Sequence, residues 1–135
     1  KQRLWLYEQV LDHQLYDRHR FRELVSALAR KHPQAEVRLL IHNDRPLVER
    51  RHRIVELMRR LPSRIQLRLG NTHYPLADQP FMLVDREGVL HRPDFDKAEG
   101  FAHFSDSGRA RLLAEEFQRM WEAGKPSLEL RELPL

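Results

Sequence analysis

The sequence contains no cysteine, which excludes disulfide bonds, thiolate nucleophiles and zinc sites with cysteine ligands. Aromatic residues make up only 8% of the chain. No apolar run approaches the roughly 18 residues of a membrane-spanning helix, and no charged-then-apolar signal segment opens the chain. The last two absences predict a cytoplasmic protein with no membrane partner.

Several motifs of known chemistry are also missing. There is no P-loop, no G-x-G-x-x-G and no G-x-S-x-G, so neither a nucleotide cofactor nor hydrolase chemistry is indicated. The eight histidines form no H-x-x-x-H pair with a nearby acid in the pattern of zinc ligands. We therefore expect no metal site and no cofactor.

The composition, with 41% hydrophobic and 33% charged residues, is typical of a soluble globular protein. A length of 135 residues suits one core, so we expect residues 1–135 to form a single α/β domain. The first residue is Lys1 and not Met, and from this we expect a domain excised from a longer protein.

Positive charge is concentrated in the middle of the chain. Residues 42–68 contain eight arginines against three acids, whereas residues 69–135 are acidic overall. Such an excess attracts phosphate or carboxylate groups. The alternative is an ordinary solvated helix face, and the sequence alone leaves both explanations open.

Apolar side chains recur at three- and four-residue intervals in residues 17–31 and 46–61, which predicts two amphipathic helices. Asp17 and Asp44 stand at the expected N-cap positions of these helices. The second helix carries most of the central arginines, so it is the natural place for a charged surface.

Three strands are predicted around these helices. Residues 36–41 form a nearly continuous apolar run, typical of a strand covered on both faces, and residues 64–69 alternate. Residues 4–11 favour a strand by composition, and we expect it to be an edge strand or a remnant of a linker. Strand, helix, strand, helix, strand is the order of an open α/β sheet.

The second half of the chain predicts a hairpin, another strand, a helix and a tail. The expected segments are a hairpin of residues 80–84 and 88–91, a strand near residues 101–104, a helix from Asp106 or Ser107 to about Gly124, and an edge strand or docking segment at residues 125–135. The predicted fold is α/β, a mixed sheet with helices packed on it, in the order β-α-β-α-β-β-β-α.

This order is similar to one half of the phospholipase D-like fold. The segments PFMLVDREGVLHRP and EEFQRMW resemble the hairpin and the closing helix of those domains. More narrowly, IHNDRPLVERRHRIVELMRRLPS and FMLVDREGVLHRPDFDKAEGFAHFSD resemble an uncharacterised bacterial domain that follows GNAT-type acetyltransferase domains. The second resemblance implies a covalently linked acetyltransferase domain as a partner.

The chemistry of phospholipase D-like enzymes is not implied by the resemblance. Those enzymes use H-x-K-x4-D, in which the histidine is the nucleophile. Aligning the motif's aspartate with Asp85 places Asp78 and Pro80 at the histidine and lysine positions. Asp85 is then more simply explained as a residue of the hairpin turn.

A candidate site for an anionic ligand lies at the start of the second predicted helix. His42, Asp44 and Arg45 follow a central strand directly, where loops diverge in open α/β sheets and a helix N-terminus presents free N–H groups. The alternative is structural, with Asp44 capping the helix and His42 bonded to a neighbouring loop.

Arg51 and His52 complete the candidate ligand or anion site. On a continuous helix, Arg51 falls inside the apolar arc and must pair with an anion or an internal acid, whereas His52 falls on the polar arc. The candidate internal partners of Arg51 are Asp44, Asp85, Asp94 and Glu99.

Three functions are open to such a chain. The first is a non-catalytic binding or regulatory module attached to an acetyltransferase-type domain. The second is a phosphate or nucleic-acid binding domain that uses the basic segment from Arg45 to Arg64, although no aromatic residue is interleaved there to stack on bases. The third, an enzyme site built on His42, has no nucleophile with an adjacent base. The first strand or the leucine-rich tail is a candidate for homodimer pairing.

Overall fold

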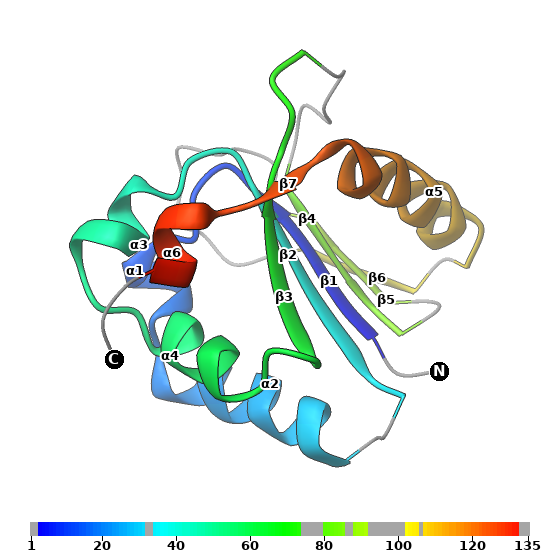
Figure 1. The fold of residues 1–135 in the computed structure, drawn as a ribbon. Coiled ribbons are helices and arrows are strands. Elements are labelled where there is room, and N and C mark those ends of the chain that lie inside the picture. Colours follow the sequence, from blue (N-terminus) through cyan, green and yellow to red (C-terminus); the bar gives the residue numbers. More distant parts are fainter. Residues whose placement is uncertain are drawn as a thin grey trace.

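The computed structural model describes residues 3–31, 34–73, 80–85, 88–91, 102–105 and 107–132. Three parallel strands lie at the centre of its sheet (Figure 1), namely β1 (Arg3–Glu8), β2 (Glu36–Ile41) and β3 (Ile65–Leu69). The predicted order of strands and helices in the first half of the chain is therefore confirmed.

Four further strands extend the sheet, and all of them run antiparallel to their neighbours. They are β4 (Phe81–Val84), β5 (Gly88–His91), β6 (Ala102–Ser105) and β7 (Lys125–Pro126). The strand order is β6-β5-β4-β1-β2-β3-β7. The sheet is thus mixed, as the sequence predicts, and the predicted hairpin is the pair β4 and β5; Phe101 and Asp106 lie outside the described residues.

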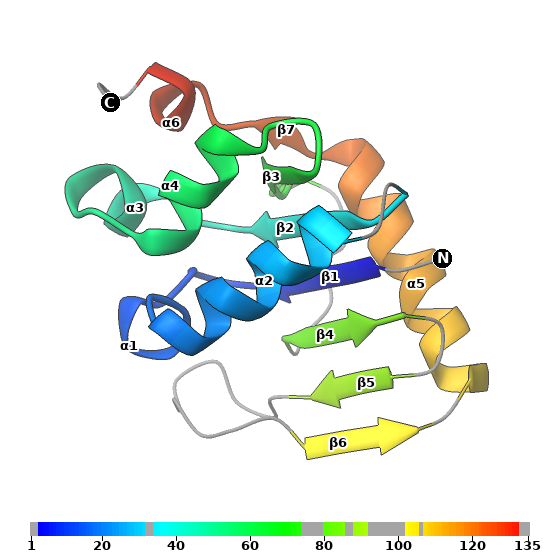
Figure 2. The ribbon, with the colours of Figure 1, turned by 90° about the horizontal axis from the view of Figure 1, so that it is seen from below.

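Helices cover both faces of the sheet (Figures 1 and 2). They are α1 (His13–Tyr16), α2 (His19–Lys31), α3 (Arg45–Glu49), α4 (Arg53–Arg60), α5 (Ser107–Ala123) and α6 (Leu128–Glu132). Figure 1 shows α2 and α4 on one side of the sheet and α5 on the other.

The two faces bury different side chains. Leu6, Leu39 and Leu67 lie side by side on β1, β2 and β3 and belong to the core beneath α2 and α4. On the opposite face Trp5 stacks on Phe117 of α5, with ring centroids 5.0 Å apart. Burying each leucine side chain stabilises the fold by roughly 1.5–3 kcal/mol, so alternation along the strands holds helices on both faces.

The expectation of an edge strand or a linker remnant at residues 4–11 is wrong. β1 pairs with β2 along one edge and with β4 along the other, and every residue from Leu4 to Glu8 is buried. A strand covered on both faces has no need of polar alternation, which explains its apolar run. Because both edges of β1 are occupied, β1 cannot pair with a second copy of the chain.

Asp17 also differs from its predicted role. It lies two residues before α2, and its Oδ1 atom accepts a hydrogen bond of 2.8 Å from the backbone N–H of Arg53. The carboxylate therefore serves the first residue of α4 instead of its own helix. This contact ties the two helices of one face together.

Candidate functional site

The basic segment forms two short helices and not the single predicted one. α3 ends at Glu49 and α4 begins at Arg53, and between them Arg50 and His52 have extended backbone angles. His52 caps α4, because its Nδ1 atom accepts a hydrogen bond of 3.1 Å from the N–H of Ile54. The break rotates every following side chain relative to a continuous helix.

Arg51 does not face the core, so this prediction is wrong. Its side chain is 86% exposed, and its Nε atom donates a hydrogen bond of 2.7 Å to Oε1 of Glu56. This hydrogen bond raises the pKa of Arg51 and lowers the pKa of Glu56. Neither Asp44 nor Asp85 is its partner, and the other two candidates, Asp94 and Glu99, lie outside the described residues.

His52 is buried, with 2% exposure, and not on a polar surface as predicted. Since Nδ1 accepts the capping bond, Nε2 carries the proton of the neutral ring. Among the described residues, no acceptor lies within hydrogen-bond distance of Nε2. Burial lowers the pKa of His52 to about 4, so the ring is neutral at pH 7.

No pattern in the sequence indicated the partner of this histidine. The ring of His13, in α1, lies 4.8 Å from the ring of His52. Its Nε2 atom is 3.0 Å from the carbonyl oxygen of Arg51 and 3.3 Å from that of Arg50, so it donates to the backbone at the break. A helix almost 40 residues earlier in the chain therefore holds the α3–α4 connection in place.

A groove of about 870 Å³ opens over the break. Within the described part of the chain, its lining includes four arginines, Arg50, Arg51, Arg59 and Arg60, and two carboxylates, Glu49 and Glu56. His52 and the apolar residues Leu47, Val48 and Val55 complete the lining. The structure thus brings together two of the five predicted site residues, Arg51 and His52, in a groove with an excess of positive charge.

His42 lies apart from this groove, on the α5 face of the sheet. Its Nε2 atom is 2.6 Å from the hydroxyl of Tyr7, and the N–H groups of His42 and Asn43 both donate to the carbonyl of Gln9. Burial lowers the pKa of His42, so the imidazole is neutral at pH 7. The bond to a side chain of β1 supports the structural alternative for this residue.

Asp44 and Arg45 bind the C-terminal segment. Asp44 stands at the N-cap position of α3 but makes no capping bond; instead its Oδ2 atom accepts a hydrogen bond of 2.5 Å from the hydroxyl of Ser127. Arg45 lies 3.7 Å from Glu49 and 4.0 Å from Glu129 of α6. Both residues therefore fasten α6 to α3, and neither lines the groove.

The part of the chain that the structure describes contains no group of three or more His, Asp or Glu side chains that could hold a metal ion. Within the same residues, no helix combines the length and the apolar character that crossing a bilayer requires.

The family model described as "Domain of unknown function (DUF7931)" matches residues 1–133. The chain belongs to the DUF7931 family. No curated protein matches it.

Two solved structures share the fold of this DUF7931 domain. TrmBL2, described as an archaeal chromatin protein with a novel mode of DNA binding, is 16% identical with a TM-score of 0.58. The match covers 93% of this chain and 45% of that one. Nuc from Salmonella typhimurium, a phospholipase D family member, is 20% identical with a TM-score of 0.56 over 94% of this chain and 82% of its own. The phospholipase D-like fold predicted from the sequence is therefore supported.

Asp85, which the sequence alignment placed at the aspartate of the phospholipase D motif, has a structural role here. Asp85 follows β4 with a φ of 58°, in the left-handed region where few residues other than glycine are found. Its backbone N–H donates to the carbonyl of Arg3, and its carboxylate accepts from the N–H of Arg3. Pro80 is buried at the lysine position, whereas Asp78, at the histidine position, lies outside the described residues.

Proposed function

We propose that this domain is a non-catalytic binding module that holds the phosphate backbone of a nucleic acid in the arginine-lined groove over α3 and α4. The observation that carries the proposal is the groove itself, in which four arginines face two carboxylates. The absence of the motif's histidine and lysine, with Asp78 and Pro80 in their places, supports a role without phosphodiester chemistry.

The charge balance of the groove favours exchange of its ion pair for a phosphate. Arg51 is 86% exposed, and exposed ion pairs of this kind contribute about 0–1 kcal/mol. A phosphate oxygen can therefore replace the carboxylate of Glu56 at small cost. Arginine suits the exchange because its planar guanidinium binds phosphate in a bidentate manner.

The groove favours backbone recognition over base recognition. Among the described residues, no aromatic side chain other than His52 lines it, and the ring of His52 is buried, so these residues provide no platform for stacking on bases. Phosphate contacts carry affinity but little sequence information. The DNA-binding description of TrmBL2, whose solved structure shares the fold, also favours this proposal.

Salt dependence of binding to a labelled DNA duplex tests the proposal. Four phosphate contacts predict a slope of about −3.6 in log K against log salt, or a loss of about 10²-fold in affinity between roughly 50 and 200 mM salt. The Arg50→Ala/Arg60→Ala variant removes two contacts and is expected to halve that slope. Both residues are exposed, so the variant should remain folded.

Arg111→Ala/Arg119→Ala is the matched control. These two arginines are exposed on α5, across the sheet from the groove, and their removal changes the net charge equally. The control should bind DNA like the unaltered domain. Equal losses in both variants, or no binding at the lower salt concentration, contradict the proposal.

We further propose that the domain acts beside an acetyltransferase-type domain of the same polypeptide. The resemblance of residues 41–63 and 81–106 to the bacterial domain that follows GNAT-type acetyltransferases supports this. Intact-mass measurement of the native polypeptide provides the test. A mass close to the 16.2 kDa of these 135 residues contradicts covalent linkage, and a mass larger by a second domain is the expected result.

A further inference from the structure

The strand β3 leaves part of its outer edge uncovered. Its neighbour β7 pairs only with Arg68 and Leu69, the last two residues of the strand. Among the described strands, none pairs with the outer edge of residues 65–67. An open edge presents backbone N–H and C=O groups that can pair with another extended segment.

Two hydrogen bonds identify which backbone groups face outwards. Arg64 accepts from the N–H of Val37, and Gly70 donates to the carbonyl of Ile41, so both ends of this stretch face β2. Because successive residues of a strand direct their backbone groups to alternate edges, Gln66 and Arg68 also face β2. The N–H and C=O of Leu67 therefore point to the outer edge, just beyond the end of β7.

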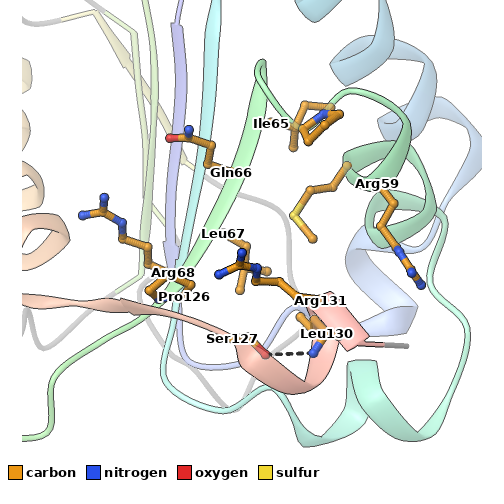
Figure 3. Close-up of a pocket in the computed structure, with 11 residues that line it drawn as sticks. Arg59, Ile65, Gln66, Leu67, Arg68, Pro126, Ser127, Leu130 and Arg131 are labelled. Atoms are coloured by element: carbon orange, nitrogen blue, oxygen red, sulfur yellow. Dashed lines mark hydrogen bonds between the residues drawn. The ribbon is translucent and has the colours of Figure 1, made fainter. Parts of the chain in front are cut away.

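A groove of about 410 Å³ runs along this edge, between α4, β7 and α6 (Figure 3). Its apolar residues are Met58, Pro62, Ile65, Leu67, Pro126 and Leu130. Three arginines line it as well, Arg59, Arg68 and Arg131, and no carboxylate among the described residues does. The groove therefore joins an open strand edge to an apolar surface with positive charge.

The two faces of the edge differ in chemistry. Figure 3 shows Gln66 and Arg68 on one side of β3, and Ile65 and Leu67 on the other. Arg68 already donates to the carbonyl of Trp121, at 2.7 Å, and its guanidinium lies over the Trp121 ring. An added strand would thus place alternate side chains against an apolar surface and beside a fixed arginine.

The chain itself turns away from this edge at Ser127. The hydroxyl of Ser127 donates to Asp44 and accepts from the N–H of Leu130 in the first turn of α6. The chain therefore enters α6 at Leu128 instead of continuing β7. Because Ser127 is buried, with 3% exposure, these bonds fix the turn. The position that a longer β7 would occupy beside Leu67 stays open.

We propose that this edge binds an extended acidic segment of a partner protein as an additional strand, in the manner of β-augmentation. Apolar side chains of the segment would pack on Ile65 and Leu67, and the alternating Asp or Glu side chains would lie beside Arg68, with Arg131 of α6 at the rim of the groove. Charge complementarity selects the acidic partner, because the lining holds three arginines and no described carboxylate. This surface is separate from the nucleic-acid proposal except for Arg59, which lines both grooves.

The test uses three peptides with the domain and two-dimensional NMR. The first alternates valine and glutamate, the second alternates valine and lysine, and the third is the first with its backbone N–H groups methylated. Only the first is expected to bind, because the second reverses the charge and the third cannot donate to the strand edge. Binding should slow hydrogen exchange at the Leu67 N–H, which exchanges faster than those of Gln66 and Arg68 in the free domain.

Arg131→Glu is expected to lower the affinity for the acidic peptide by about tenfold or more, since it places a negative charge at the rim of the groove. Arg111→Glu on α5 is the matched control and should bind normally, because both side chains are exposed and the charge change is equal. Equal binding of the methylated peptide overturns the strand-addition proposal. A Leu67 N–H that is already protected in the free monomeric domain also overturns the proposal. Protection that appears together with a concentration-dependent dimer overturns it as well, because a second copy of the chain would then occupy the edge.

Discussion

The buried imidazole of His52 predicts that acid destabilises this domain. The pKa of the ring falls from 6.5 to about 4 on folding, because burial disfavours the charged form. The unfolded chain therefore binds a proton at pH values where the folded chain does not. Stability is full above about pH 6.5 and decreases as the pH falls towards 4.

The expected magnitude follows from this shift. Linkage gives a loss of about 2 kcal/mol between pH 7.5 and pH 5, and about 3 kcal/mol by pH 4. Most small domains have a total stability of about 5–15 kcal/mol, so the loss from one histidine is measurable.

Denaturant unfolding at several pH values, followed by tryptophan fluorescence, provides the assay. Trp5 and Trp121 are 7% and 3% exposed, so unfolding changes the surroundings of both. The informative variant is His52→Asn, because asparagine can still cap α4 but does not titrate. Between pH 7.5 and pH 5, the free energy of unfolding of this variant should decrease by about 2 kcal/mol less than that of the unaltered domain.

A second histidine separates this effect from general acid sensitivity. His19 is 76% exposed, so His19→Asn should leave the pH dependence unchanged. The lowered pKa of His42 adds the same pH dependence to the stability of the unaltered domain and of His52→Asn, so it cancels when the two are compared. Parallel pH profiles for His52→Asn and the unaltered domain would refute the reasoning, since they would show that His52 titrates alike in both states.

Two further substitutions test how the C-terminal segment is held. Gly124→Ala is expected to lower the stability of the domain by about 1–3 kcal/mol, because the added Cβ would lie 2.8 Å from the carbonyl oxygen of Leu69. Thermal unfolding measures the loss, and an unchanged midpoint contradicts the prediction. Ser127→Ala, Asp44→Ala and their double variant should show a coupling energy of about 0.5–3 kcal/mol in denaturant unfolding, because the two side chains share a partly buried hydrogen bond. Strictly additive effects would show that the bond does not hold α6.

Sequence periodicity predicted the strands and most helices because the core has two faces. Residues 36–41 form a nearly continuous apolar run and residues 64–69 alternate, and in the structure Leu39 and Leu67 lie under α2 and α4. Residues 4–11 were harder, since their apolar run fits any strand buried on both faces and says nothing about its place in the sheet. That place depends on pairing with β4, almost 80 residues later in the chain.

The candidate site was predicted less well, because distant contacts decide it. The helical wheel placed Arg51 in the core, but the wheel applies only to a continuous helix, and His52 interrupts it by capping α4. The contacts of His13 and Asp17 with this break come from a helix and a turn far earlier in the chain. Periodicity carries no information about such contacts. The sequence therefore predicted which segment is basic, but not the break between α3 and α4 or the side chains that line the groove.

Asp85 shows why a retained motif residue does not indicate retained chemistry. Its φ of 58° lies in the left-handed region, which aspartate adopts more readily than most residues other than glycine, and local contacts hold it there. Three hydrogen bonds between Arg3 and Asp85 do so, and they join the end of β4 to the start of β1 at the centre of the sheet. A residue with this structural role is needed for the fold whether or not a nucleophile lies nearby. The structural role of Asp85 is therefore independent of any chemistry at this position, and an aspartate here does not by itself predict phosphodiester catalysis.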